Sequence, residues 1–352
     1  MNRRTKATLE DVARLAGVST ATVSRALSRP DLLQEDTLAR VQGAIARLHY
    51  VPGGAARALA SGKTLTIGAV VPTLDHAIFA RAIQAMQTEL AASGYQLLIA
   101  ASDYVPALEA AAVKAMLARG VDALMVVGAD HLDETWALLT TAPVPVVLSW
   151  SFDPRVPSIG FDNVRAGRIV AEYLLDLGHR SFGMISGHTR ANDRARMRVE
   201  GVRAALAARG LDLPPSSVIE TSFTLTGGRA GLAELMARAE PPTAIVCGND
   251  LLAAGALLEA QASGIGVPDQ VSLAGIDNLE IAAHLTPALT TVHLPTTDLG
   301  RSVAAHLLGR LKGQEPPLRQ ELPIELVIRR STGPAPALGP ARAAMERSAA
   351  RG

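Results

Sequence analysis

The segment from Thr8 to Leu27 places short side chains and one long donor at spacings that suit contact with DNA. Arg25 can pair with guanine through two hydrogen bonds, and Ala21 or the Thr20 methyl can touch a thymine methyl. Because hydroxyl groups and a helix N-terminus bind phosphate, the candidate DNA contacts are Thr8, Ser19, Thr20, Ala21, Thr22, Ser24 and Arg25. The alternative is a structural three-helix module on which Arg25 is a solvated charge.

A second candidate DNA contact lies in residues 50–63, which we interpret as a linker with a short, Ala-rich helical half. Leu59 could insert as an apolar wedge into the minor groove, with Ala56 beside it and Arg57 near phosphate. Two glycines at the start of this stretch make such a helix marginal on its own. The alternative is a leucine that packs on a neighbouring lobe.

Farther along the chain, polar and aromatic residues follow apolar, strand-like runs. Ligands of open α/β sheets bind at the carboxyl ends of the strands, where these residues would lie. Aromatic, amide, carboxylate and guanidinium groups suit a hydroxyl-rich ligand. The candidates of this kind are Trp150, Arg190, Arg194, Arg198, Phe223, Asn249 and Asp277. Each taken singly could instead be a helix cap, a core aromatic or a solvated charge.

Patterns that would indicate catalysis or a metal are missing from the sequence. It contains no Gly-x-Ser-x-Gly, no phosphate-binding Gly-Lys-Ser/Thr loop and no His-Glu-x-x-His, and its eight histidines are not at metal-ligand spacing. The single cysteine, Cys247, excludes an intramolecular disulfide and is expected to be an inert core thiol. His179 is expected to end a helix. We therefore predict no enzyme activity, no cofactor and no metal.

Three short helical patterns in residues 8–49 would position the first set of candidates. Thr8 can cap the first helix with Asp11 as its partner, and Ser19 can cap the second after a turn at Gly17. An apolar stripe at helical spacing marks the third. Two short helices, a tight glycine turn and a supporting helix predict a helix-turn-helix head over residues 1–49.

From residue 64 onward, buried strand patterns alternate with amphipathic helices such as Phe79–Ser93, Gly167–Leu177 and Val199–Arg209. This alternation predicts an α/β body of doubly wound parallel sheets. A break near Asp162–Asn163 divides it into an N-lobe (64–162 plus 293–322) and a C-lobe (163–292 plus 323–333), followed by a disordered tail, 334–352. The predicted strands are Leu65–Val71, Gln96–Ala100, Ala123–Val127, Val144–Leu148, Phe182–Ser186, Val218–Thr221, Ala244–Cys247 and Val271–Ile276.

Composition agrees with a large buried core, because 48% of the 352 residues are apolar and 19% are charged. No apolar run is long enough for a membrane helix and none follows the basic start as a signal peptide would, so we expect a soluble cytoplasmic protein. Residues 1–63 hold ten basic and five acidic residues, a charge of +5 in a chain whose net charge is +1. This basic head suggests a polyanionic partner, although an ordinary solvated surface would also explain it.

These motifs resemble those of the LacI (lactose-repressor-like) family of bacterial transcription regulators over almost all of residues 8–333. The matching segments are Ala16-Gly17-Val18-Ser19, Thr22-Val23-Ser24-Arg25, Tyr50-Val51-Pro52, Gly160-Phe161-Asp162-Asn163, Leu177-Gly178-His179, Asn249-Asp250, Gly275-Ile276-Asp277 and Leu289-Thr290-Thr291-Val292. The resemblance implies a homodimer, or a dimer of dimers, on a near-palindromic double-stranded operator. It also implies a hinge helix and a periplasmic-binding-protein-like body whose cleft binds an effector, and it adds His76, Phe79 and Phe161 to the candidate effector contacts.

Two departures from the family pattern matter. Gly53-Gly54 replace the usual start of the hinge, which should make its folding depend more on DNA, and Gln34 replaces the usual small cap before the third helix. Segments such as Val71-Pro72-Thr73-Leu74 and Gly94-Tyr95-Gln96 are similar to the gluconate-utilisation repressors.

Four arginines between residues 190 and 198 suit a carboxylate, so we expect a sugar acid such as gluconate, with a neutral sugar as the alternative. Whether the effector weakens or strengthens DNA binding stays open. Two other functional classes also stay open, a solute-binding protein and a sugar-modifying enzyme.

Overall fold

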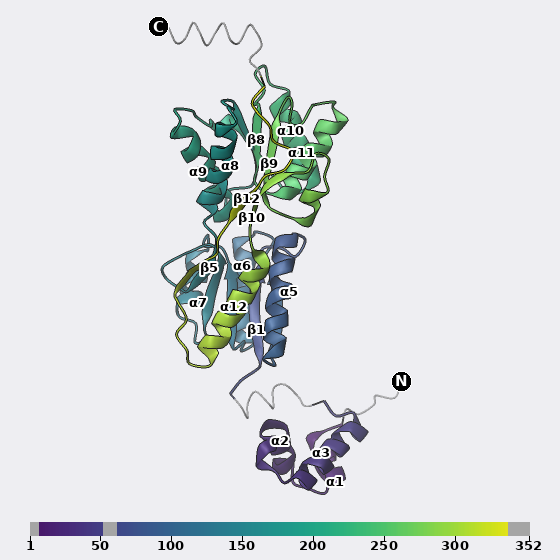
Figure 1. The fold of residues 1–352 in the computed structure, drawn as a ribbon. Helices are drawn as coiled ribbons and strands as arrows, with labels where there is room; N and C mark the ends of the chain where they lie inside the picture. Colours follow the sequence, from purple (N-terminus) through teal and green to yellow (C-terminus); the bar gives the residue numbers. More distant parts are fainter. Residues whose placement is uncertain (1–6, 52–61, 337–352) are drawn as a thin grey trace.

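The structure is a computed structural model that describes residues 7–51 and 62–336 of the chain (Figure 1). Three of the candidate DNA contacts, Ala56, Arg57 and Leu59, lie outside the described residues. Most of the tail that we predicted from residue 334, namely 337–352, also lies outside them.

The head contains the predicted helix-turn-helix, in α1 (Leu9–Ala16), α2 (Thr20–Ser28) and α3 (Glu35–Leu48), with a short 3-10 turn η1 (Pro30–Leu32) between α2 and α3. Thr8 and Asp11 form the expected capping box, since the Thr8 backbone N–H donates to the Asp11 carboxylate at 2.9 Å. Gly17 ends α1 with a φ of +66°, a conformation that favours glycine. Gln34 precedes α3 without a side-chain capping bond.

The body contains two six-stranded sheets, which confirms the predicted α/β class with two parallel-sheet lobes. The first sheet has the order β11-β5-β4-β3-β1-β2 and the second β12-β10-β9-β8-β6-β7. All neighbouring pairs are parallel except β10 with β12. The strands are β1 (Thr66–Val71), β2 (Gln96–Ala101), β3 (Ala123–Val127), β4 (Val146–Trp150), β5 (Ser158–Gly160), β6 (Phe182–Gly187), β7 (Val218–Thr221), β8 (Ala244–Cys247), β9 (Ser272–Asp277), β10 (Thr290–His293), β11 (Arg319–Glu321) and β12 (Glu325–Val327). We call the lobe on the first sheet the N-lobe and the other the C-lobe.

Helices cover both faces of each sheet, as expected of a doubly wound arrangement. They are α5 (Ala77–Ala92), α6 (Pro106–Ala118), α7 (Asp133–Thr140), α8 (Asn163–Asp176), α9 (Asp193–Ala207), α10 (Leu225–Met236), α11 (Asp250–Ala262) and α12 (Thr296–Leu311), with short 3-10 turns η2 (Pro215–Ser217) and η3 (Glu280–Ala283). One apolar cluster packs α6 and α7 on the N-lobe sheet, and another packs α10 and α11 on the C-lobe sheet. A third cluster includes residues of α5, α8, α9 and α12 and of both sheets.

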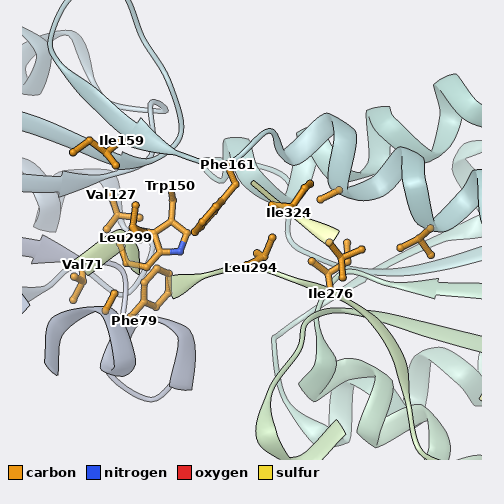
Figure 2. Packing of buried hydrophobic residues seen from close by; sticks show 14 of the residues in the cluster. Val71, Phe79, Val127, Trp150, Ile159, Phe161, Ile276, Leu294, Leu299 and Ile324 are labelled. Atoms are coloured by element: carbon orange, nitrogen blue, oxygen red, sulfur yellow. The ribbon is translucent and has the colours of Figure 1, made fainter. Parts of the chain in front are cut away.

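The chain crosses between the lobes three times, after β5, after β10 and after β11. Phe161, Leu294 and Ile324 lie in these crossings and are buried in the shared cluster (Figure 2). Phe161, a predicted effector contact, is 1% exposed and packs at the junction of the lobes.

Close contact between α8 and α9 positions Arg198, which α9 carries. A Cβ atom at Gly167 of α8 would collide with the backbone oxygen of Arg198 in α9, and one at Gly201 of α9 would collide with the backbone oxygen of Val164 in α8. Glycine at these two positions therefore lets α9 lie against α8, which fixes the backbone that carries Arg198.

None of the helices in residues 7–51 and 62–336 combines the length and apolar character that crossing a bilayer requires.

Candidate functional site

The N-terminal end of α2 presents the predicted DNA-contacting side chains on an exposed surface. Ser19, Thr20 and Ala21 are exposed, whereas Val23 and Ala26 are buried and hold α2 against the other helices of the head. Ser19 caps the helix as predicted, because its hydroxyl accepts a hydrogen bond from the Thr22 N–H at 3.1 Å. The solvent-facing side of this helix thus combines a capped N-terminus with small side chains.

Arg25 lies one turn farther along α2 and is exposed. Neighbouring arginines of the head are paired, Arg14 with Asp11 at 3.2 Å and Arg40 with Asp36 at 3.3 Å. The side chain of Arg25 has no ion pair or hydrogen bond in the part of the chain that the structure describes, so its donors are available to a partner.

In the body, eight of the ten predicted effector contacts line one narrow cavity between the lobes. This inner cavity is lined by the predicted residues His76, Phe79, Trp150, Arg194, Arg198, Phe223, Asn249 and Asp277, and by Ile78, Tyr104, Asn192 and Ala195. Arg190 instead lines a wider outer cavity, which shares His76, Tyr104, Asn192 and Phe223 with the inner one.

Arg198 is 5% exposed and lies at the floor of the inner cavity. Its Nε donates to Asn163 Oδ1 at 3.1 Å and its Nη1 to the Gly248 carbonyl at 2.6 Å. Burial lowers the pKa of Arg198, but a guanidinium stays protonated at neutral pH. The structure therefore places a buried, oriented cation where a ligand would lie.

Asp277 does not neutralise this cation fully. Its Oδ1 is 3.7 Å from Arg198 Nη1 and has no hydrogen-bond partner among the described residues. Burial raises the pKa of Asp277 to about 8, against the opposing effect of Arg198. Because the hydrogen bonds of Arg198 go to an amide oxygen and a backbone carbonyl, which carry no net charge, the site favours an anionic ligand.

Trp150 contributes a second unpaired group, since its Nε1 has no hydrogen-bond partner among the described residues. Figure 2 shows its indole beside Phe79, and their ring centroids are 5.0 Å apart. Trp150 has a φ of +66° and Asp277 a φ of +127°, conformations that cost energy for residues other than glycine. Strain at two residues of the same cavity is typical of a binding site.

Three rings lie between the inner and outer cavities. The Phe223 ring is 5.5 Å from that of His76 and 6.2 Å from that of Tyr104. Burial lowers the pKa of His76 and raises that of Tyr104, so both are uncharged at neutral pH. These rings supply apolar faces that can pack against the carbon skeleton of a ligand.

Asn249 fills two roles. Its Oδ1 accepts a hydrogen bond from the Leu252 N–H at 2.9 Å and so caps α11. A helix cap was the alternative to a ligand contact that the sequence left open for this residue. Its Nδ2 donates no hydrogen bond to another described residue, and the side chain lines the inner cavity.

Tyr104 and Asn192 line the inner cavity but were not among the predicted contacts. A signal for Tyr104 was present, because it follows the predicted strand 96–100 and parallel strands point their carboxyl ends toward the ligand. Asn192 directly precedes α9, as its N-cap, and only the helix boundary would have identified it.

The remaining predictions of the body concern residues outside the cavity. Cys247 is fully buried in β8, and burial raises the pKa of its thiol, as expected of an unreactive core cysteine. His179 follows α8 and its ring bonds the hydroxyls of Thr243 and Ser272. Within residues 7–51 and 62–336, no group of three or more His, Cys, Asp or Glu side chains is arranged to hold a metal ion.

The head and the body of the chain each match the profile of a known protein family. Residues 8–53 match the profile described as "Bacterial regulatory proteins, lacI family". Residues 171–332 match that of a "Periplasmic binding protein-like domain".

Three relatives match nearly their whole length. The HTH-type transcriptional repressor PurR of Escherichia coli O1:K1 is 32% identical over 94% of this chain and 98% of its own. The lac repressor dimer bound to operator and the anti-inducer ONPF is similar in structure, with a TM-score of 0.83 and 27% identity over 94% of this chain and 100% of that one. The transcription regulator GntR from Chromobacterium violaceum has a TM-score of 0.72 and 31% identity over 76% of this chain and 99% of that one.

Proposed function

The chain belongs to the lacI family of bacterial regulatory proteins, and we propose that its cleft binds a small sugar acid that controls the affinity of the head for operator DNA. It is a DNA-binding transcriptional regulator, and its relatives are repressors rather than enzymes. The family responds to small-molecule effectors; the identity of this chain's effector is our proposal.

The observation that carries the sugar-acid assignment is the buried Arg198, whose hydrogen bonds go to neutral groups and whose Nη1 is 3.7 Å from the unpaired Asp277 Oδ1. A carboxylate can accept a charge-assisted bond from Arg198. Ligand hydroxyls can then satisfy Asp277 Oδ1 and Asn249 Nδ2, while the rings of Phe223 and Phe79 pack against the carbon chain. A neutral sugar would leave the positive charge of Arg198 without a counter-charge.

On the DNA side, we propose that α2 enters the major groove, with Arg25 reading a guanine and Ser19, Thr20, Ala21, Thr22 and Ser24 contacting bases or phosphate. Thr8 would contact phosphate at the start of α1. We further propose that two copies of the chain bind a near-palindromic operator in the cytoplasm, with Ala56, Arg57 and Leu59 of the linker at its centre. One solved relative is a dimer on its operator, which supports this arrangement.

The coupling follows from the two lobes. An effector that bonds Arg198 and Asp277 of the C-lobe and packs on Phe79 and Trp150 of the N-lobe favours one relative position of the lobes. Suppose that this arrangement of the lobes and the alternative arrangement set different spacings between the two linkers. The free energy of operator binding then changes by the difference in the effector's binding free energy between the two arrangements, typically ~1–3 kcal/mol.

Calorimetric titration of the full chain with gluconate and with glucose tests the effector class. We expect gluconate to bind and glucose to bind at least about tenfold more weakly. Binding of glucose alone would overturn the sugar-acid assignment while leaving the DNA-binding role intact.

A further inference from the structure

The first turn of α9 in the C-lobe is joined to a turn of the N-lobe, residues 128–130, by two sets of polar contacts. Arg196 pairs with Asp130 through two hydrogen bonds, from Nη1 and from Nη2, each 2.7 Å long. Arg196 Nη1 also donates to the Thr189 carbonyl at 3.2 Å. This planar, two-bond geometry is the strongest that an arginine and a carboxylate can form.

Asp193 makes the second set of contacts from inside the same turn. The backbone N–H of Ala129 in the N-lobe donates to Asp193 Oδ2 at 3.1 Å, and Arg194 Nη1 donates to Asp193 Oδ1 at 2.7 Å. The Asp193 side chain is 1% exposed. Burial opposes its ionisation, but the Arg194 charge and the hydrogen bonds to the carboxylate outweigh burial and lower the pKa of Asp193. The carboxylate is therefore charged when it bonds the N-lobe.

The N-lobe turn has the shape that this contact requires. Gly128 has a φ of +86°, and a Cβ atom there would collide with the guanidinium of Arg194 and approach Asp193 Oδ1 to 2.9 Å. Glycine at this position therefore leaves the space into which α9 inserts its first turn.

We propose that Gly128, Ala129, Asp130, Asp193 and Arg196 form an interlobe latch, whose role is to hold the cleft closed and to position Arg194 against the effector. The proposal rests on the proposed function, because it takes the inner cavity as the effector site. None of the five residues lines that cavity, whereas Arg194 does. The latch residues are thus positioning residues that raise effector affinity without touching the effector, and Arg194 is the group they deliver.

Because the latch residues and Arg194 have different roles, substitutions at Asp130 and at Arg194 should have different effects. Asp130→Asn weakens the latch and should weaken binding of every ligand by the same factor. That factor is about fivefold, since both partners of the ion pair are partly exposed, with 42% and 27% of their side chains accessible. Arg194→Met removes a guanidinium from the cavity wall, so it should reduce the preference for an acid over a neutral sugar.

Hydrogen exchange of the full chain tests the latch without any ligand. In Asp130→Asn, exchange in the peptide that spans residues 128–131 should rise about fivefold, because the Ala129 amide loses its partner whenever the lobes separate. Arg196→Lys keeps a charge but loses the two-bond geometry, so its exchange should lie between those of wild type and Asp130→Asn. The matched control is Asp176→Asn, which breaks a 2.8 Å ion pair with Arg209 inside the C-lobe and should change nothing at residues 128–131.

Calorimetry with gluconate and glucose on the same variants completes the test. A Kd for gluconate that rises about fivefold in Asp130→Asn, at an unchanged ratio of acid to neutral affinity, supports the latch. Wild-type exchange at residues 128–131 together with wild-type affinity in Asp130→Asn overturns it. If the wild type binds neither ligand, the sugar-acid assignment fails, and the exchange result still decides for or against the latch.

Discussion

Replacing Arg198 by methionine should abolish tight binding of a sugar acid while leaving the chain folded. Methionine keeps much of the buried aliphatic volume but removes every donor of a side chain that is 5% exposed. Truncating one partner of a buried, charged hydrogen bond costs about 2–5 kcal/mol of binding free energy. The Kd for gluconate should therefore rise at least about 30-fold.

The substitution should also lower the stability of the fold, for reasons visible around the side chain. The substitution leaves Asn163 Oδ1 and the Gly248 carbonyl without their donor, at about 1–3 kcal/mol for each unsatisfied group. Removing a buried cation partly offsets this cost. Asn163 also keeps its 2.9 Å bond to the Trp150 carbonyl.

Calorimetric titration with gluconate, alongside urea unfolding, separates the two effects of Arg198→Met. The matched control is Arg165→Met, at an exposed position of α8. Binding of gluconate within about threefold of wild type by a folded Arg198→Met would refute the role of this guanidinium as the carboxylate partner.

Three further substitutions test other parts of the account. Arg25→Ala should weaken operator binding by about 1–3 kcal/mol and relax the preference at one base pair, measured by anisotropy with a panel of single-base variants; an unchanged profile would remove Arg25 from base readout. Because the pKa of Asp277 is raised to about 8, its protonated form contributes stability that is fully present below about pH 4 and is lost as the pH rises through 8. Asp277→Asn should therefore reduce the difference in unfolding free energy between pH 5 and pH 8, and a difference as large as in wild type would contradict the burial argument. Gly167→Ala should destabilise the chain by about 1–3 kcal/mol in urea unfolding, since its methyl group would meet the Arg198 backbone; wild-type stability would show that α8 and α9 can separate without cost.

The head was predictable because its signals are local. A capping residue such as Ser19, a glycine at the turn and an apolar stripe at helical spacing each act within a few residues of the chain. The alternation of apolar strands and helices also predicted the class of the body, because strands buried on both faces are unusually apolar. The short strands β5, β10, β11 and β12 were missed, since runs of three or four residues carry no periodic pattern.

The candidate cleft was predictable in outline for a topological reason: residues that follow parallel strands meet at one edge of each sheet. That rule brought Trp150, Asn249 and Asp277 together. It gave no way to distinguish Arg198, which lines the inner cavity, from Arg196, which bonds the other lobe, or from Arg190 in the outer cavity. Arg196 and Arg198 are separated by the side of α9 that each occupies, and Arg190 lies in the loop before this helix. The packing of Phe161 could not be predicted for a related reason, since an aromatic residue after a strand can turn either into the cleft or into the crossing between lobes, where Phe161 lies.

The measurement that tests the central claim most directly is the affinity of the full chain for its operator with and without gluconate. A duplex selected from a random pool by the chain itself serves as the operator, and fluorescence anisotropy gives the Kd. We predict that saturating gluconate changes this Kd by about 5- to 150-fold, and that Arg198→Met keeps the operator affinity but loses the response. An operator Kd that stays the same while calorimetry shows gluconate bound to the chain would contradict the claim that the cleft controls the head.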